Sequence, residues 1–116
     1  MQRDRALASC RGLPGATEGF PFSDTALVFK VGGKMFALVD IGPGQGSVSL
    51  KCDPGYAAAV REQYPAVTAG YHLNKRHWNT VLLDGSVADE LLTEWIRESY
   101  DLAVAGLTRA QRAALG

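Results

Sequence analysis

Residues 26–41 read ALVFKVGGKMFALVDI, and this stretch decides the fold. Two runs rich in β-branched and aromatic residues, 26–31 and 34–41, flank Gly32-Gly33, and a glycine pair between such runs is typical of a two-residue hairpin turn. Pairing outward from the turn gives three opposed pairs that we expect on the core face: Val31 with Lys34, Phe29 with Phe36, and Leu27 with Leu38. The other face would carry Val28, Lys30, Met35 and Ala37.

The next segments predict a third strand and a helix. After the glycine-rich turn 42–46, residues 47–51 alternate in polarity, as a strand with two different faces does. We expect its apolar residues to point inward and its polar residues outward: Val48 and Leu50 against Ser47, Ser49 and Lys51. Asp53-Pro54 is typical of a helix start, and Pro65 ends that helix after Tyr64. Its expected buried stripe has four-residue spacing: Tyr56, Val60 and Tyr64.

The N-terminal part predicts a short helix and a loop. Residues 2–11 form a helix that Gly12 and Pro14 end, with Ala6, Leu7 and Cys10 directed inward. The loop 13–24 follows. It contains Phe20 and Phe22, and we expect these rings to hold the loop against the core.

The second half completes an α+β pattern. A loop or short strand over 67–75 precedes a strand over 77–83. Ser86 and Asp89 resemble a capping box that opens a long helix over 87–105, and Thr108 caps a short terminal helix. The order predicts one domain, 1–116, of the α+β class. Its mostly antiparallel sheet of four to five strands has helices packed on one face.

Composition restricts the classes of function. Twelve Lys and Arg residues balance twelve Asp and Glu residues, so the overall charge does not favour non-specific binding to nucleic acid, although a local basic patch would. Cys10 and Cys52 belong to no metal-spaced cluster. The charged start, Met1–Arg5, precedes no apolar stretch, and no run is long enough to span a bilayer. We expect a cytoplasmic, monomeric protein with reduced thiols, no cofactor and no metal.

Three stretches carry a resemblance to a known family: residues 27–37, 49–54 and 70–81, the last reading GYHLNKRHWNTV. Together with the flanking segments 13–18 and 99–102, they closely resemble the MmcQ/YjbR family of small bacterial proteins. The resemblance covers nearly the whole chain. It implies a CyaY-like α+β fold, sometimes described as a "double wing", and a DNA-binding function.

The segment from His72 to Trp78 is the candidate site for that function. Cationic and amide donors beside an aromatic ring suit phosphate contact and base stacking, and no acidic residue follows until Asp84. With lysines from the predicted strands, the candidate nucleic-acid-binding set is Lys30, Lys34, Lys51, His72, Asn74, Lys75, Arg76, His77 and Trp78. In the alternative interpretation, Trp78 is a core anchor, Asn74 is a turn residue and the cations lie in a solvated loop.

Other functions have less support. A protein-interaction module using the acidic long helix or a sheet edge is the alternative to DNA binding. The five-residue spacing of His72 and His77 matches no recurrent zinc site, and helical spacing spreads the acids of residues 89–101 too widely for a frataxin-like metal site. The glycines of 42–46 precede a strand and not a helix, and no base accompanies Cys52. We therefore expect binding and not catalysis. DNA binding requires the acids and the basic segment to lie on different faces.

Overall fold

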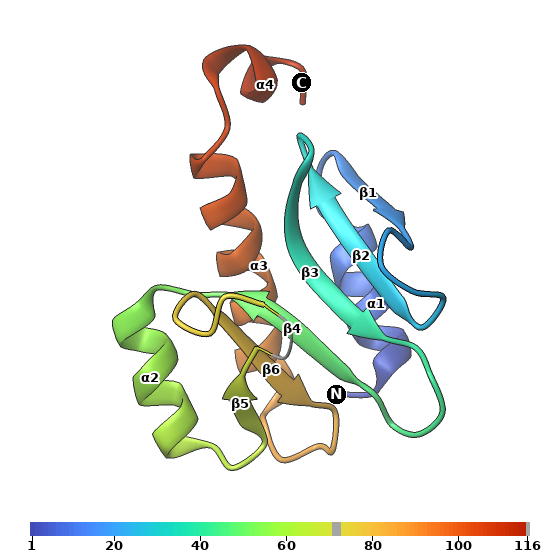
Figure 1. The fold of residues 1–116 in the computed structure, drawn as a ribbon, viewed down its shortest axis with the longest axis vertical. Helices are drawn as coiled ribbons and strands as arrows, with labels where there is room; N and C mark the ends of the chain where they lie inside the picture. Colours follow the sequence, from blue (N-terminus) through green and yellow to red (C-terminus); the bar gives the residue numbers. More distant parts are fainter. Residues whose placement is uncertain (71–72, 116) are drawn as a thin grey trace.

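The computed structural model describes residues 1–70 and 73–115 and has a single antiparallel sheet (Figure 1). The strand order is β1-β2-β3-β4-β6-β5, and every described pairing is antiparallel. The strands are β1 (Ala16–Gly19), β2 (Ala26–Val31), β3 (Lys34–Asp40), β4 (Ser47–Lys51), β5 (Val67–Ala69) and β6 (Trp78–Leu82). The predicted α+β class is confirmed. The described sheet has six strands instead of four to five, because β1 forms within the segment predicted as a loop and pairs with β2.

Helices cover one face of this sheet. The helices that contact its strands are α1 (Arg3–Arg11), α2 (Pro54–Gln63) and α3 (Asp89–Ala105), and the short α4 (Arg109–Ala113) lies beyond the end of α3 (Figure 1). In Figure 1, α1 and α3 lie behind the sheet, and α2 lies beside β5. The ring of Tyr64, just after α2, packs edge-on against Trp95 of α3, with 5.6 Å between ring centroids. None of the described helices is both long enough and apolar enough to cross a membrane.

Several local signals were predicted correctly. The Asp53 side chain caps α2 by accepting a hydrogen bond from the backbone N of Tyr56 at 3.3 Å. Thr108 and Gln111 form a capping box at the start of α4. The capping prediction for Ser86 was wrong: α3 begins at Asp89 after Ala88, and Ser86 instead binds the Asp84 carboxylate in the preceding turn. The α2 stripe was wrong at Tyr56, which is 41% exposed.

A β-bulge changes the predicted register of the hairpin. Val31 opposes Lys34 as expected, but Phe29 opposes Ala37 and not Phe36. Phe36 is an extra residue on β3. Compared with the predicted register, such a bulge moves every later side chain of β3 to the other face of the sheet. Ala37 therefore lies in the core. The next pairs also differ from the prediction: Leu27 opposes Val39, and Val28 opposes Leu38.

Two aromatic rings lie in the core at the bulge, as the sequence predicted. Phe29 and Phe36 are both fully buried, with ring centroids 6.2 Å apart. Phe36 also packs edge-on against Tyr100 of α3 at 5.4 Å. The predicted core positions of Phe20 and Phe22 were wrong, since their side chains are 50% and 66% exposed. These residues follow β1, which is the edge strand of the sheet, so their loop lies at the margin of the sheet and not over the core.

The hydroxyl of Ser99 joins α3 to the point where β3 and β4 separate. The β3–β4 pairing covers Ala37–Val39 and ends at Leu50. At the next position, the fully buried Ser99 Oγ accepts a hydrogen bond from the Lys51 backbone N at 2.8 Å and donates one to the Phe36 carbonyl. A helix side chain thus bridges two strands in place of a direct ladder bond, satisfying backbone groups that would be costly to bury alone.

We predict that Ser99→Ala lowers the free energy of unfolding by about 1–3 kcal/mol, because it leaves the Phe36 carbonyl and the Lys51 N–H without this partner. Urea denaturation measures the effect. Thr93→Ala on the exposed side of the same helix is the matched control and should change stability by less than about 0.5 kcal/mol. Equal effects of the two substitutions would contradict the bridging role of Ser99.

Candidate nucleic-acid interface

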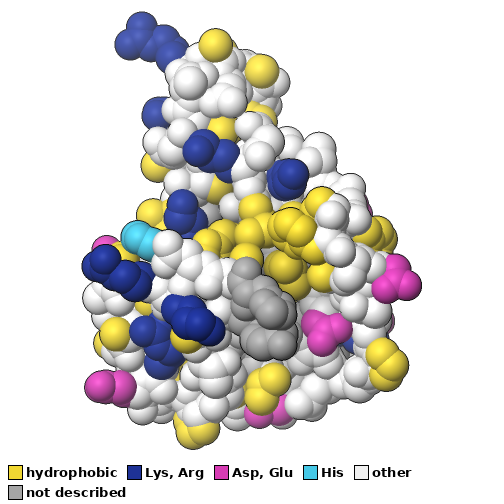
Figure 2. Space-filling model, viewed as in Figure 1, with side chains coloured by type: hydrophobic (Ala, Val, Ile, Leu, Met, Phe, Trp, Pro, Cys, Tyr) yellow, Lys and Arg dark blue, Asp and Glu magenta, His cyan; other side chains and the backbone are white. Residues whose placement is uncertain are grey.

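The sheet face opposite α1 and α3, here called the open face, is mixed in character. Strand pairing directs its side chains away from the core cluster: Val28, Lys30, Met35, Leu38, Ser49, Lys51, Trp78 and Thr80. Ser49 was correctly predicted to point away from the core, but it is buried, and its hydroxyl lies 2.8 Å from that of Thr80. Figure 2 shows this face with Lys and Arg side chains to the left of and above an apolar area, and Asp or Glu side chains to its right and below it.

Four of the predicted site residues line a single hollow at one side of this face. Lys51, Asn74, His77 and Trp78 enclose a shallow space of about 400 Å³, here called the Lys51 hollow. Its remaining lining residues are Asp53, Pro54 and Leu102. Lys51 and Trp78 are opposed on β4 and β6, and the other two come from the β5–β6 connection. The hollow therefore assembles side chains from separate parts of the chain.

Backbone hydrogen bonds build the loop that carries Asn74 and His77. The Asn74 carbonyl accepts from the backbone N of Trp78 at 2.9 Å, and its side-chain Oδ1 accepts from the backbone N of Arg76 at 3.0 Å. The His77 carbonyl in turn accepts from the Cys52 backbone N at 2.7 Å. These bonds make Asn74 a turn residue and place His77 beside the end of β4.

Arg61 is a member of this region that sequence reasoning missed. From α2, its Nη1 donates to Asn79 Oδ1 at 2.7 Å and to the Lys75 carbonyl at 3.3 Å. Asn79 is buried and also donates to the Ala57 carbonyl. The guanidinium thus holds the loop against α2, and it leaves the side chains of Lys75 and Arg76 exposed to solvent.

Trp78 is mostly covered. Its side chain is only 8% exposed, so little of the ring is available for stacking with a base. The backbone of Gly70 lies against it: a Cβ at residue 70 would approach the Trp78 Cβ to 2.8 Å. Trp78 therefore positions the loop by packing.

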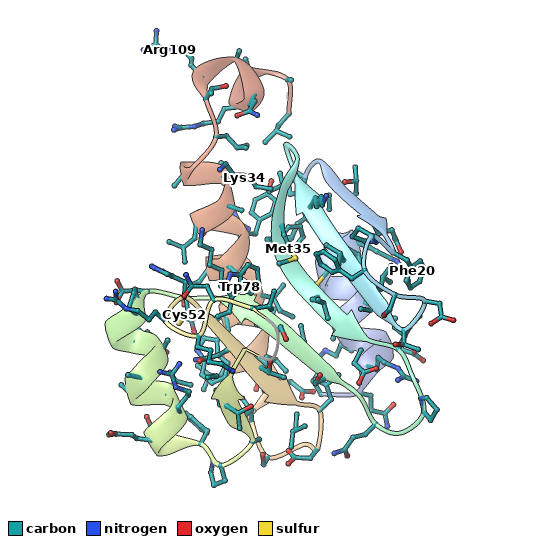
Figure 3. All side chains as sticks on the ribbon, viewed as in Figure 1. Phe20, Lys34, Met35, Cys52, Trp78 and Arg109 are labelled. Atoms are coloured by element: carbon teal, nitrogen blue, oxygen red, sulfur yellow. The ribbon has the colours of Figure 1, made fainter. Side chains whose placement is uncertain are left out.

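The other predicted residues lie elsewhere. Lys30 lines a second hollow, of about 380 Å³, with Phe20, Pro21 and Val28 at the far side of the open face. Lys34 begins β3, and its aliphatic chain lies beside Gly106 at the end of α3. His72 lies outside the described residues. Figure 3 labels Phe20, Met35 and Trp78 across the face, with Met35 between the other two.

Charges are distributed unequally between the two layers. The ion pairs among residues 1–70 and 73–115 use the N-terminal amine, Arg5, Arg11 and Arg97, all on or before α1 or on α3. Within that part of the chain, no lysine forms an ion pair. Most acids lie on the helices, whereas Asp40 is the acid that strand pairing directs to the open face.

Some carboxylates do approach Lys51. Asp53 lines the Lys51 hollow, and Glu98 and Asp101 line an adjoining hollow with Lys51 and Cys52. Burial, then Glu94 and Asp101, raise the pKa of Glu98 above its ordinary value. The cationic character is therefore clearest at Lys75, Arg76 and Lys30. Over the described ranges, no three His, Cys, Asp or Glu side chains are grouped so that they could hold a metal ion.

These features define a class of protein: an α+β domain whose helices cover one face of an antiparallel sheet and leave the other open. The family model described as YjbR matches residues 11–102. The chain is 37% identical to the uncharacterized protein YjbR of Escherichia coli K12 over 112 residues, covering 97% of this chain and 95% of that protein. It is 36% identical to YbdF of Escherichia coli O157:H7 over 97 residues, or 84% and 80% of the two chains. The chain belongs to the YjbR family, which confirms the resemblance.

Solved structures agree with this assignment. The crystal structure of the Deinococcus radiodurans protein DR2400 matches with a TM-score of 0.92 and 46% identity, covering 100% of this chain and 89% of that one. A Pseudomonas syringae protein matches with a TM-score of 0.76 over 89% and 99% of the two chains. At 24% identity, the second match shows the fold alone. The names of these proteins state no activity, so the comparisons establish family and fold.

Both cysteine thiols have raised pKa values, and Cys52 is the residue next to Lys51. Burial, then Glu98 and Asp53, raise the pKa of the Cys52 thiol, and burial raises that of Cys10 to about 12. Because the thiolate is the nucleophile, we predict that iodoacetamide modifies Cys52 at neutral pH more slowly than an unfolded cysteine and leaves Cys10 unmodified. The rate at Cys52 should rise with pH. Mass spectrometry of the alkylated peptides measures both sites.

Glu98→Gln provides the test of the charge effect. Removing this carboxylate should lower the pKa of Cys52 and speed its alkylation at neutral pH, whereas Glu90→Gln, in the first turn of α3, should leave the rate unchanged. The same rate in the wild type and Glu98→Gln would contradict the proximity of Glu98 to Cys52.

Proposed function

We propose that this protein binds nucleic acid by contacting phosphates with the open face and the adjoining basic loop. The observation that carries the proposal is the separation of charge: the ion-paired cations are the N-terminal amine and arginines of α1 and α3, and the described lysines form no ion pair. A neutral chain can hold a polyanion in this way, because contact depends on the local field at the surface. The proposed role is binding and involves no chemical step.

Four cations are central to the proposed contact. Lys30 and Lys51 project from the open face, and Lys75 and Arg76 are exposed in the adjoining loop. Neutralising four phosphates would make the logarithm of the binding constant fall with the logarithm of salt concentration, with a slope of about −3 for a single strand and about −3.6 for a duplex. Such a slope is modest, as suits a protein without net charge.

A protein-interaction module is the second candidate, and the acidic surface of α3 favours it. Glu90 and Glu94 are exposed on this helix, which lies behind the sheet in Figure 1. A basic protein partner would suit these carboxylates. Glu90→Lys with Glu94→Lys would abolish binding of such a partner and leave nucleic-acid binding intact.

The test of the main proposal is a salt series of binding to short DNA. We predict that Lys75→Glu with Arg76→Glu abolishes measurable binding and leaves the thermal midpoint nearly unchanged, because both side chains are exposed. Fluorescence anisotropy of a labelled oligonucleotide measures affinity at each salt concentration.

The matched control reverses two exposed cations of the helix layer. Arg5→Glu with Arg97→Glu changes the net charge by the same amount as the loop variant but alters α1 and α3. This control should retain most of the affinity. Equal losses in the two double variants would show a non-specific effect of net charge, and an unaltered affinity in the loop variant would remove the loop from the site.

A further inference from the structure

Two phenylalanine rings are exposed in the loop after β1, and one of them, Phe20, lies beside the open face. Phe20 and Phe22 follow β1 and flank Pro21, and they are 50% and 66% exposed. Phe20, Pro21, Val28 and Lys30 line the second hollow, so Phe20 lies next to a cation of the open face. Large exposed apolar groups gathered at one place are characteristic of a binding surface.

Each of the two hollows contains a lysine that strand pairing directs to the open face: Lys30 in the second hollow and Lys51 in the Lys51 hollow. Lys30 is on β2 and Lys51 on β4, with only β3 between these strands. Because β3 and β4 separate before Lys51, the two lysines are further apart than two strand spacings, which is more than about 10 Å, or more than about three nucleotide steps of about 3.4 Å. Met35 and Leu38 of β3 form a half-buried, uncharged surface between them.

We propose that the nucleic acid bound by this face is single-stranded, and that its bases stack on Phe20 and Phe22 while its phosphates contact Lys30 and Lys51. This inference rests on the proposed function. Stacking on an aromatic side chain requires a base whose flat face is free, which a single strand offers and the interior of a duplex does not. Because every base has such a face, binding would tolerate different sequences.

The charge of the surface favours a polyanion over an apolar protein partner. Lys30 forms no ion pair with any described residue, and the other charged residue of the same hollow, Glu18, is paired with Arg11 of α1. Asp24 is an exposed acid in the loop that carries the rings. Asp40, the acid directed to this face, accepts a hydrogen bond from the Gly42 backbone N at the far end of β3. A cation beside exposed rings matches phosphates alternating with bases.

The experiment compares a short labelled single strand with a duplex of the same sequence and length. The wild-type protein should bind the single strand more tightly. Phe20→Ala with Phe22→Ala should weaken single-strand binding by about tenfold or more, because each ring supports stacking, and leave duplex binding unchanged. The salt dependence of the remaining binding should keep its slope, since neither ring is charged.

Leu82→Ala is the matched control. Leu82 is an exposed apolar residue of β6 on the same side of the sheet, opposite Ser47 and away from both hollows. Its substitution should change neither affinity. A thermal midpoint close to that of the wild type should accompany the double variant, because Phe20 and Phe22 contribute little to the core.

Three outcomes would overturn the inference. If the phenylalanine variant binds the single strand as tightly as the wild type, or the duplex is preferred, the stacking role is wrong, while loss of binding in the loop variant would still support the proposed function. If neither probe binds at any salt concentration, the proposed function fails and the inference fails with it. If sedimentation shows a wild-type dimer that the variant lacks, the rings belong to an interface between copies.

Discussion

The geometry of this domain depends on one buried hydroxyl. Ser99 Oγ connects the carbonyl of Phe36, the bulged residue of β3, to the backbone N of Lys51 at the end of β4. The bridge fixes α3 against the sheet at the point where the two strands separate. Beyond it, β4 pairs with β6 up to Lys51 and Trp78, which line the Lys51 hollow. The same hydrogen bonds that complete the core therefore position the candidate interface.

Charge is organised by layer. The N-terminal amine and Arg5 bind Asp89, and Arg11 binds Glu18, so α1 uses its cations to join α3 and β1. Each of these exposed pairs contributes little stability, but its carboxylate neutralises a positive charge on the helix side of the molecule. The lysines remain for the open face and its margins. A chain with no net charge can thus present a cationic surface, although the carboxylates near Lys51 reduce the field at that position.

Local patterns predicted much of the fold. The strands around Gly32-Gly33 and the Asp53 and Thr108 caps depend on neighbouring residues, and the family resemblance was also correct. The bulge at Phe36 could not be predicted in this way, because it depends on contacts with Ser99 and Tyr100 more than sixty residues away. The basic loop was found from its composition. Arg61 was missed because its role depends on Asn79, which the fold brings near, and exposed Phe20 contradicts the usual burial of apolar rings.

The central claim, that the open face and not the helix layer holds the nucleic acid, is tested most directly by NMR chemical-shift mapping during titration with a single-stranded oligonucleotide. We predict perturbed backbone amides along β2, β3, β4 and β6 and in residues 73–77. The oligonucleotide concentration needed for saturation should rise with salt concentration. The amides of α1 and of the first half of α3 should remain unchanged. Perturbations confined to those helices, or an unchanged spectrum at low salt, would contradict the account.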